Sequence, residues 1–183
     1  MRIVGGNFRG RSIAGPKSVA IRPTSDRLRE SIFNILMHGY DDPVSGARVL
    51  DLFSGTGALG LEAMSRGAAH ALFVDEGTEA RALIRQNVET LGLAGVTRLF
   101  RRDATKLGAV HPNEPYSLIF LDPPYGKGLA EKALLSARDG GWMTRNALIM
   151  VEEVKGAFVT PDGFNEIERR AYDDTEIVFL KLA

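Results

Sequence analysis

The chain has 183 residues, 44% of them hydrophobic, which is enough for one sizeable core but short for two domains. Its 23 Lys and Arg balance its 23 Asp and Glu, so net charge alone neither favours nor excludes a polyanionic partner. Cysteine is absent, which excludes disulfides, thiolate metal sites and thiol nucleophiles. Its apolar runs fall far below the roughly 20 residues of a membrane span. Residues 1–6 lack the apolar stretch of a secretory signal, so we expect a cytoplasmic protein.

The charges are unevenly distributed along the chain. Residues 1–30 hold seven basic and two acidic residues, a net charge of +5, and the rest of the chain therefore carries −5. A basic arm on an acidic body suits docking to a phosphate backbone. The alternative is an ordinary solvated terminus.

The N-terminal residues predict a small hairpin followed by a helix. Short β-type stretches flank the Gly-Gly-Asn sequence at residues 5–7, which is typical of a hairpin within residues 1–15. Thr24, Ser25 and Asp26 offer N-cap residues, and apolar residues then recur at helical spacing to about His38.

From residue 48 onward, short apolar runs alternate with helical stretches, and this βαβ rhythm predicts an α/β fold with a parallel sheet. The missing polar alternation in the strands indicates a sheet covered on both faces. The last two segments, joined by Asp173 and Asp174, predict a closing hairpin. The expected strands are 48–53, 70–75, 97–102, 117–122, 147–152, 166–172 and 175–181, and the expected helices are 58–66, 77–91 and 128–138.

A glycine-rich loop directly follows the first of these strands. Residues 54–60, Ser-Gly-Thr-Gly-Ala-Leu-Gly, place glycines in GxGxxG register. Gly55 and Gly57 permit positive φ and close approach of a ligand to the backbone, and Gly60 lets the helix pack against the strand. The pattern predicts a nucleotide or nucleoside site, with a tight packing turn as the alternative. Three further loop residues are candidate cofactor ligands, namely Phe53, Ser54 and Thr56.

Asp51 lies at the end of the first strand, four residues before the first glycine of the loop. Its carboxylate would repel the pyrophosphate of a dinucleotide, but it favours the cationic ammonium and sulfonium groups of S-adenosylmethionine. The alternative is a carboxylate that ties down loop amides, and the two roles are compatible.

Acidic residues also end the second and third strands. Asp75 and Glu76 lie where an acid accepts hydrogen bonds from ribose hydroxyls, and Asp75 is the better candidate, although the choice between them stays open. Asp103 is placed to accept from an adenine amino group, and the backbone of Ala104 is placed to bind a ring nitrogen. An ordinary turn aspartate is the alternative at residue 103.

The fourth strand leads into Asp-Pro-Pro-Tyr at residues 122–125. Two prolines fix the backbone and remove two donors, so this loop presents carbonyl acceptors in a rigid frame. Asp122 and the Pro123 carbonyl are suited to accept the two N–H bonds of an exocyclic amine while Tyr125 stacks on its base. A rigid turn without chemistry is the alternative.

These motifs together resemble the class I S-adenosylmethionine-dependent methyltransferases, and more narrowly the bacterial family that methylates guanine N2 in 16S ribosomal RNA. The resemblance covers nearly the whole chain. The segments that resemble this narrower family most closely are RIVGGNFRGR at 2–11, RPTSDRLRE at 22–30 and FNIL at 33–36. The glycine loop at 50–63 and LDPPY at 121–125 occur in many amino-methylating enzymes.

The resemblance implies a Rossmann-like class I fold with a seven-stranded, mostly parallel sheet whose last strand is antiparallel. It implies a single domain in which residues 1–40 help to bind RNA and residues 41–183 form the catalytic core. It assigns Asp51, Gly55, Gly57, Asp75, Asp103 and Ala104 to S-adenosylmethionine and Asp122, Pro123 and Tyr125 to the target base. The candidate RNA contacts are Arg9, Arg11, Arg22, Thr24 and Arg27.

Several alternatives remain open for the activity. An amino-methyltransferase acting on another RNA, on DNA adenine N6 or on a protein glutamine would use the same loops. An NAD(P)-dependent oxidoreductase has no use for the Asp-Pro-Pro-Tyr loop, and a non-catalytic RNA-binding factor has no need to keep it. The three histidines show no ligand spacing, so we expect no metal site. We expect a monomer that acts on 16S RNA or on the assembling small ribosomal subunit.

Overall fold

The computed structural model describes residues 1–183 and contains one seven-stranded sheet with four α-helices. The strands are β1 (Arg48–Leu52), β2 (His70–Val74), β3 (Thr97–Phe100), β4 (Tyr116–Leu121), β5 (Met143–Val154), β6 (Phe164–Tyr172) and β7 (Thr175–Leu182). The helices are α1 (Asp26–Gly39), α2 (Ala58–Ser65), α3 (Thr78–Thr90) and α4 (Leu129–Asp139), with short 3₁₀ turns at Gly6–Phe8, Ala94–Val96 and Ala104–Lys106.

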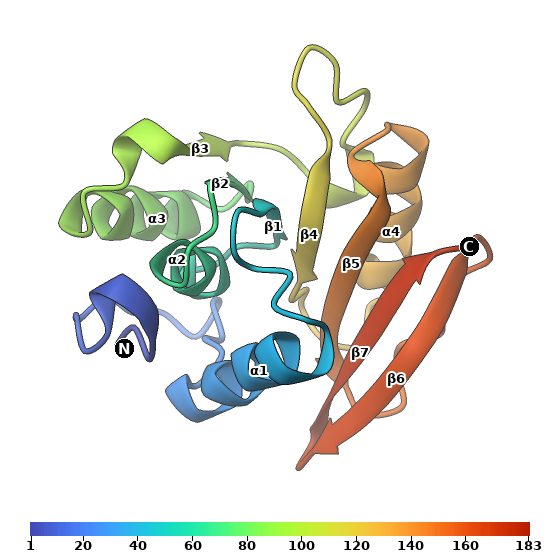
Figure 1. Ribbon diagram of the computed structural model, residues 1–183, viewed down its shortest axis with the longest axis horizontal. Helices are drawn as coiled ribbons and strands as arrows, with labels where there is room; N and C mark the ends of the chain where they lie inside the picture. Colours follow the sequence, from blue (N-terminus) through green and yellow to red (C-terminus); the bar gives the residue numbers. More distant parts are fainter.

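The strand order is β3-β2-β1-β4-β5-β7-β6, and the first five strands of the chain run parallel (Figure 1). Strand β7 is antiparallel to both β5 and β6. This confirms the Rossmann-like α/β fold, its mostly parallel sheet and its antiparallel last strand. The order reverses between β1 and β4, and at such a switch point the carboxyl ends of the strands open a crevice for ligands.

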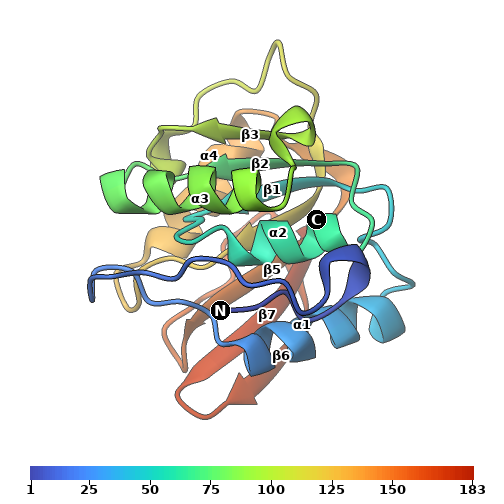
Figure 2. The ribbon, with the colours of Figure 1, turned by 90° about the vertical axis from the view of Figure 1, so that its left-hand side faces the viewer.

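Both faces of the sheet are buried along most of β1, β2, β4 and β5, as the absence of polar alternation predicts, whereas β6 is mostly exposed. In β4, Leu118 and Phe120 belong to one apolar cluster, and Ile119 and Leu121 belong to another. Helices α1, α2 and α3 cover the first face and α4 lies on the second (Figure 2). No helix is both long and apolar enough to cross a membrane.

The N-terminal hairpin is less regular than the sequence predicts. Only one antiparallel bridge forms, between Arg2 and Ser12, because the backbone N–H groups of Val4 and Gly5 turn instead to the buried carboxylate of Glu62 in α2, each at 2.9 Å. The expected appendage is also part of the main core. Its apolar residues Ile3, Ile13, Ile32, Phe33 and Leu36 join the cluster on the first face of the sheet.

The ends of two elements follow from local chemistry. The Ser25 side chain accepts a hydrogen bond from the backbone N–H of Leu28, so it is the N-cap of α1, as its sequence position predicts. Strand β1 ends one residue earlier than expected because Phe53 adopts a φ of +56°, a left-handed conformation that a bulky residue rarely takes. Such strain is concentrated at functional sites, and here it directs the chain into the glycine loop.

Candidate active site

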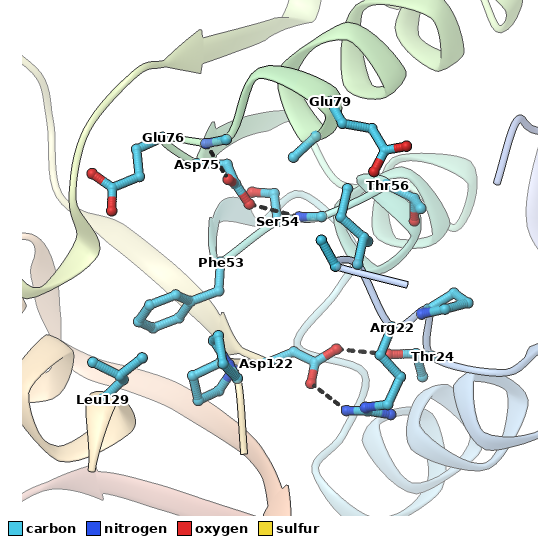
Figure 3. Close-up of a pocket in the computed structure, with 18 of the residues that line it drawn as sticks. Arg22, Thr24, Phe53, Ser54, Thr56, Asp75, Glu76, Glu79, Asp122 and Leu129 are labelled. Carbon is cyan, nitrogen blue, oxygen red and sulfur yellow. Dashed lines mark hydrogen bonds and ion pairs between the residues drawn. The ribbon is translucent and has the colours of Figure 1, made fainter. Parts of the chain in front are cut away.

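A cavity of about 780 Å³ lies at the carboxyl edge of the parallel strands (Figure 3). This volume falls within the range of about 300–1,000 Å³ that small-molecule sites occupy. Most of the predicted site residues line it, which brings the loops after β1, β2, β3 and β4 together. The predicted residues in its wall are Arg22, Thr24, Phe53, Ser54, Gly55, Thr56, Asp75, Glu76, Asp103, Asp122, Pro123 and Tyr125.

The glycines of the loop have distinct roles. Gly55 has a φ of +60° and lines the cavity, where an added Cβ would lie 3.4 Å from Ile21. Gly57 has a φ of +82°, but its missing side chain faces the core, so it does not line the cavity. At Gly60 an added Cβ would lie 2.5 Å from a Phe73 ring carbon. Glycine there allows α2 to pack closely against the sheet, as predicted.

Asp75 connects two loops at the cavity wall. Its carboxylate accepts hydrogen bonds from the backbone N–H groups of Gly55 at 3.0 Å and Gly77 at 2.8 Å. These contacts leave further lone pairs on both oxygens for a ligand. Glu76 also lines the cavity, so the choice of ribose ligand between the two acids stays a prediction.

Asp51 lies behind the loop rather than in the cavity wall. It is fully buried, and its Oδ2 accepts the Gly60 N–H at 3.0 Å. Burial raises its pKa well above the usual value, and the nearby Asp75 adds to this. The geometry thus supports the alternative that Asp51 ties down a backbone amide, and it gives no direct path to a ligand.

The loop after β3 is anchored by Asp103. Its carboxylate accepts hydrogen bonds from the backbone N–H and the hydroxyl of Thr105, at 2.9 and 2.7 Å, and these bonds lower its pKa. Asp103 remains in the cavity wall, whereas Ala104 is buried at the start of a 3₁₀ turn and does not line it. The predicted contact between the Ala104 backbone and adenine stays a prediction.

Asp122 is held by the N-terminal segment. Its Oδ2 accepts a hydrogen bond from the Thr24 hydroxyl at 3.0 Å, and its Oδ1 lies 3.3 Å from the Arg22 guanidinium (Figure 3). Burial raises the pKa of Asp122 well above its usual value, and the neighbouring Glu152 carboxylate adds to this shift against the opposing effects of Arg22 and Thr24. The predicted base-binding acid thus lies beside residues 22–24, which are about 100 positions away in the chain.

Tyr125 provides a flat surface beside Asp122. The Arg22 guanidinium carbon lies 3.9 Å from the centroid of its ring, and the Tyr125 hydroxyl donates to Glu152 Oε2 at 3.1 Å. The pKa of Tyr125 is raised, chiefly by burial. The Arg22 guanidinium thus stacks on the Tyr125 ring, which is predicted to stack on a base. Because Arg22 lines the cavity, this face of the ring is accessible from it.

Glu152 is a further residue of the site, one that was not predicted from the sequence. It lies near the end of β5 and is fully buried, and its carboxylate contacts Arg22, Tyr125 and the neighbourhood of Asp122. Asp75, Asp103 and Asp122 were predicted because each follows the carboxyl end of a parallel strand, where ligands bind. Glu152 could have been predicted in the same way, because β5 is a parallel strand that ends at the same edge of the sheet. It was overlooked because it follows an apolar run without a turn motif.

Three predicted RNA contacts lie outside the cavity. Arg9 and Arg27 are exposed, and the Arg11 guanidinium donates to the Thr90 carbonyl at 2.8 Å. Their role in RNA binding stays a prediction. No group of three or more potential ligands is placed to hold a metal ion.

The cavity wall is strongly acidic. Arg22 is the one basic residue in it, against five acids: Asp75, Glu76, Glu79, Asp103 and Asp122. Such a wall favours a cationic ligand and disfavours the pyrophosphate of a dinucleotide.

Comparison with known proteins agrees with this geometry. A family model described as conserved hypothetical protein 95 matches residues 1–181. The chain is 40% identical over 161 residues to the ribosomal RNA small subunit methyltransferase D of Escherichia coli (strain K12), covering 87% of this chain and 78% of that protein. The chain belongs to this methyltransferase D family. It is also 40% identical over 141 residues to the putative rRNA methyltransferase YlbH of Bacillus subtilis (strain 168), covering 76% of this chain and 74% of that protein.

A solved structure of this kind shows the same fold. The putative methyltransferase yhhF from Escherichia coli superimposes with a TM-score of 0.82 at 32% identity, covering 100% of this chain and 97% of that chain. The fold and the family expected from the sequence are thus confirmed.

Proposed function

We propose that the protein transfers a methyl group from S-adenosylmethionine to the N2 amino group of a guanine in 16S RNA of the small ribosomal subunit. The observation that carries this proposal is the loop at Asp122, Pro123 and Tyr125, which opens into the same cavity as the glycine loop. The names of the relatives support a ribosomal RNA substrate.

The cavity suits S-adenosylmethionine in size and charge. Asp75 is fixed by two backbone N–H groups and keeps acceptor capacity for ribose hydroxyls. Asp103, whose pKa is lowered, stays ionised and can accept from an adenine amino group. When bound, the cofactor supplies an electrophilic methyl group on a positively charged sulfur.

The residues of the chain position the acceptor amine. Such an amine is a weak nucleophile, because its lone pair is delocalised into the ring. Asp122 and the Pro123 carbonyl accept its two hydrogens, which reduces this delocalisation, and Tyr125 fixes the plane of the base. Catalysis then rests on orientation and on electrostatic stabilisation of the developing cation, and Asp122 can receive the released proton.

We also propose that the basic segment at residues 1–40 contacts RNA and that residues 41–183 carry the chemistry. Arg9, Arg11 and Arg27 are free at the surface or bonded only to a backbone carbonyl, so their charge is available to phosphates. The protein acts in this view as a cytoplasmic monomer.

Two measurements test the proposed function. Titration calorimetry with S-adenosylmethionine and with NAD separates the two cofactors, and we expect binding of the first alone. Transfer of labelled methyl groups is then compared among small ribosomal subunits, naked 16S RNA, DNA and protein. Label in one or both of the ribosomal substrates supports the proposal, and label only in DNA or protein refutes it.

A further inference from the structure

The buried carboxylate of Glu152 is incompletely hydrogen-bonded. Its Oε2 accepts from the Arg22 guanidinium at 2.8 Å and from the Tyr125 hydroxyl at 3.1 Å. Its Oε1 is buried and receives no hydrogen bond. A buried charged oxygen without a donor is costly, and both partners of Oε2 belong to the cavity wall. The Glu152 carboxylate therefore lies directly behind Arg22 and Tyr125, and the base is expected to stack on Tyr125.

The Arg22 side chain contacts the Glu152 carboxylate and lines the cavity. One of its terminal nitrogens bridges Glu152 Oε2 at 2.8 Å and Asp122 Oδ1 at 3.3 Å, while the guanidinium stacks on Tyr125. The Arg22 side chain is 47% exposed, so displacing it does not disrupt the core. A planar NH₂ group stacked on Tyr125 and bonded to two carboxylates is the arrangement that an exocyclic amine requires.

Guanine carries the same chemical unit as this guanidinium. Its C2 atom is bonded to three nitrogens, of which N1 bears one hydrogen and N2 bears two, in one plane. We infer that Glu152 recognises the target guanine by accepting its N1–H and one N2–H after Arg22 moves aside. This inference rests on the proposed function and assigns specificity to a residue outside the Asp-Pro-Pro-Tyr loop.

The contact explains why two carboxylates are needed. A paired contact with N1–H and N2–H supplies a donor to the unpartnered Oε1 and replaces the donor that Oε2 loses with Arg22. The second N2 hydrogen remains for Asp122, so with guanine Glu152 takes the place that the proposed function gives to the Pro123 carbonyl. Adenine presents an acceptor at N1, so its lone pair would face the Glu152 carboxylate, and the base would be rejected.

The substitution Glu152→Gln tests this contact, because it preserves the shape and replaces one acceptor by a donor. The substrates are small subunits reconstituted with 16S RNA in which the guanine methylated by the wild type is either kept or replaced by 2-aminopurine. This analogue keeps the N2 amine but has an acceptor at N1. Loss of guanine O6 in the analogue affects both enzymes alike, so the readout is the ratio of kcat/KM for guanine to that for 2-aminopurine.

We expect the wild type to prefer guanine by about 10- to 100-fold, the range for a paired base-edge contact. In Glu152→Gln the ratio falls by at least about tenfold, since the amide donates to N1 of the analogue. Glu153→Gln is the matched control: the neighbouring Glu153 accepts the Gly126 N–H at 3.0 Å and has no contact with Arg22 or Tyr125. Glu153→Gln should keep the wild-type ratio of kcat/KM for guanine to that for 2-aminopurine, even if its rate of methyl transfer changes.

Thermal unfolding and S-adenosylmethionine affinity show whether each variant is folded, and Glu152→Asp is the second variant. The Asp side chain is one methylene shorter, so its carboxylate lies further from the base. The rate of methyl transfer should therefore fall, while guanine stays preferred over the analogue. An unchanged ratio in Glu152→Gln overturns the assignment of Glu152 and leaves the proposed function intact. If the wild type forms no N2-methylguanosine on guanine-containing subunits, the proposed function itself fails.

Discussion

The substitution Asp122→Asn removes the charge from the acid that is proposed to hold the acceptor amine. The amide keeps the shape of the side chain and one acceptor oxygen, so the hydrogen bond from Thr24 at 3.0 Å can persist. One charge-assisted hydrogen bond to the amine is removed, which corresponds to about 1.5–3 kcal/mol. We therefore expect kcat to fall by about 10- to 150-fold, while the affinity for S-adenosylmethionine, which is assigned to the other side of the cavity, stays unchanged.

The pH dependence of the same variant is a sharper test. Burial and Glu152 raise the pKa of Asp122 well above its usual value, and Arg22 and Thr24 oppose this only in part. Because the ionised form is the better acceptor, kcat/KM of the wild type rises with pH as Asp122 loses its proton. A raised pKa also means that the contribution of Asp122 to stability is present below the pKa of the unfolded chain and is lost as the pH rises through that of the folded chain.

The assay is methyl transfer to small ribosomal subunits across a series of pH values from acidic to alkaline, with thermal unfolding measured at each pH. Asp122→Asn should lack the rising limb and should lose less stability than the wild type at high pH. Asp162→Asn, at an exposed position outside the cavity, is the control and should behave as the wild type. Equal pH profiles for the wild type and Asp122→Asn, with equal rates, would refute the proposed role.

Three further predictions concern the frame of the site and the RNA surface. Gly60→Ala places a Cβ 2.5 Å from a buried ring carbon, so it should cost about 1–3 kcal/mol and lower Tm by several degrees in thermal unfolding, whereas Gly95→Ala meets no atom within 4 Å and should be neutral or slightly stabilising. Asp51→Asn keeps an acceptor for the Gly60 N–H but removes a carboxyl group whose pKa is raised by burial, so its free energy of unfolding should increase relative to that of the wild type as the pH rises, and a difference that does not increase with pH would contradict this. Replacing Arg9 and Arg11 by Ala should weaken RNA binding and reduce the slope of log K against log salt by about 0.7–0.9 for each phosphate that is no longer neutralised. An unchanged slope would exclude both residues from the RNA-binding surface.

The sheet and the loops at its edge could be predicted because each depends on local sequence. Apolar runs mark buried parallel strands, and Asp75, Asp103 and Asp122 follow such runs at the edge where ligands bind. Glycine spacing likewise predicted the positive φ of Gly55 and the close packing of α2 at Gly60, both of which favour a residue without a side chain.

Contacts between distant segments could not be predicted in this way. The pairing of Arg22 with Asp122 and Glu152 depends on how the N-terminal segment crosses the cavity, and no spacing in the sequence encodes that path. The hydrogen bonds from the N-terminal loop to Glu62 could not be predicted for the same reason. The partners of a buried acid in a helix depend on which segments pack against that helix.

The central claim is that this cavity transfers methyl groups to a guanine amine, and the most direct test identifies the product. Small subunits from cells that lack this protein are incubated with it and isotopically labelled S-adenosylmethionine, and their RNA is digested to nucleosides and analysed by mass spectrometry. We expect the label to appear as N2-methylguanosine. Label in N6-methyladenosine, on a ribose or on no nucleoside at all, although the cofactor binds, would contradict it.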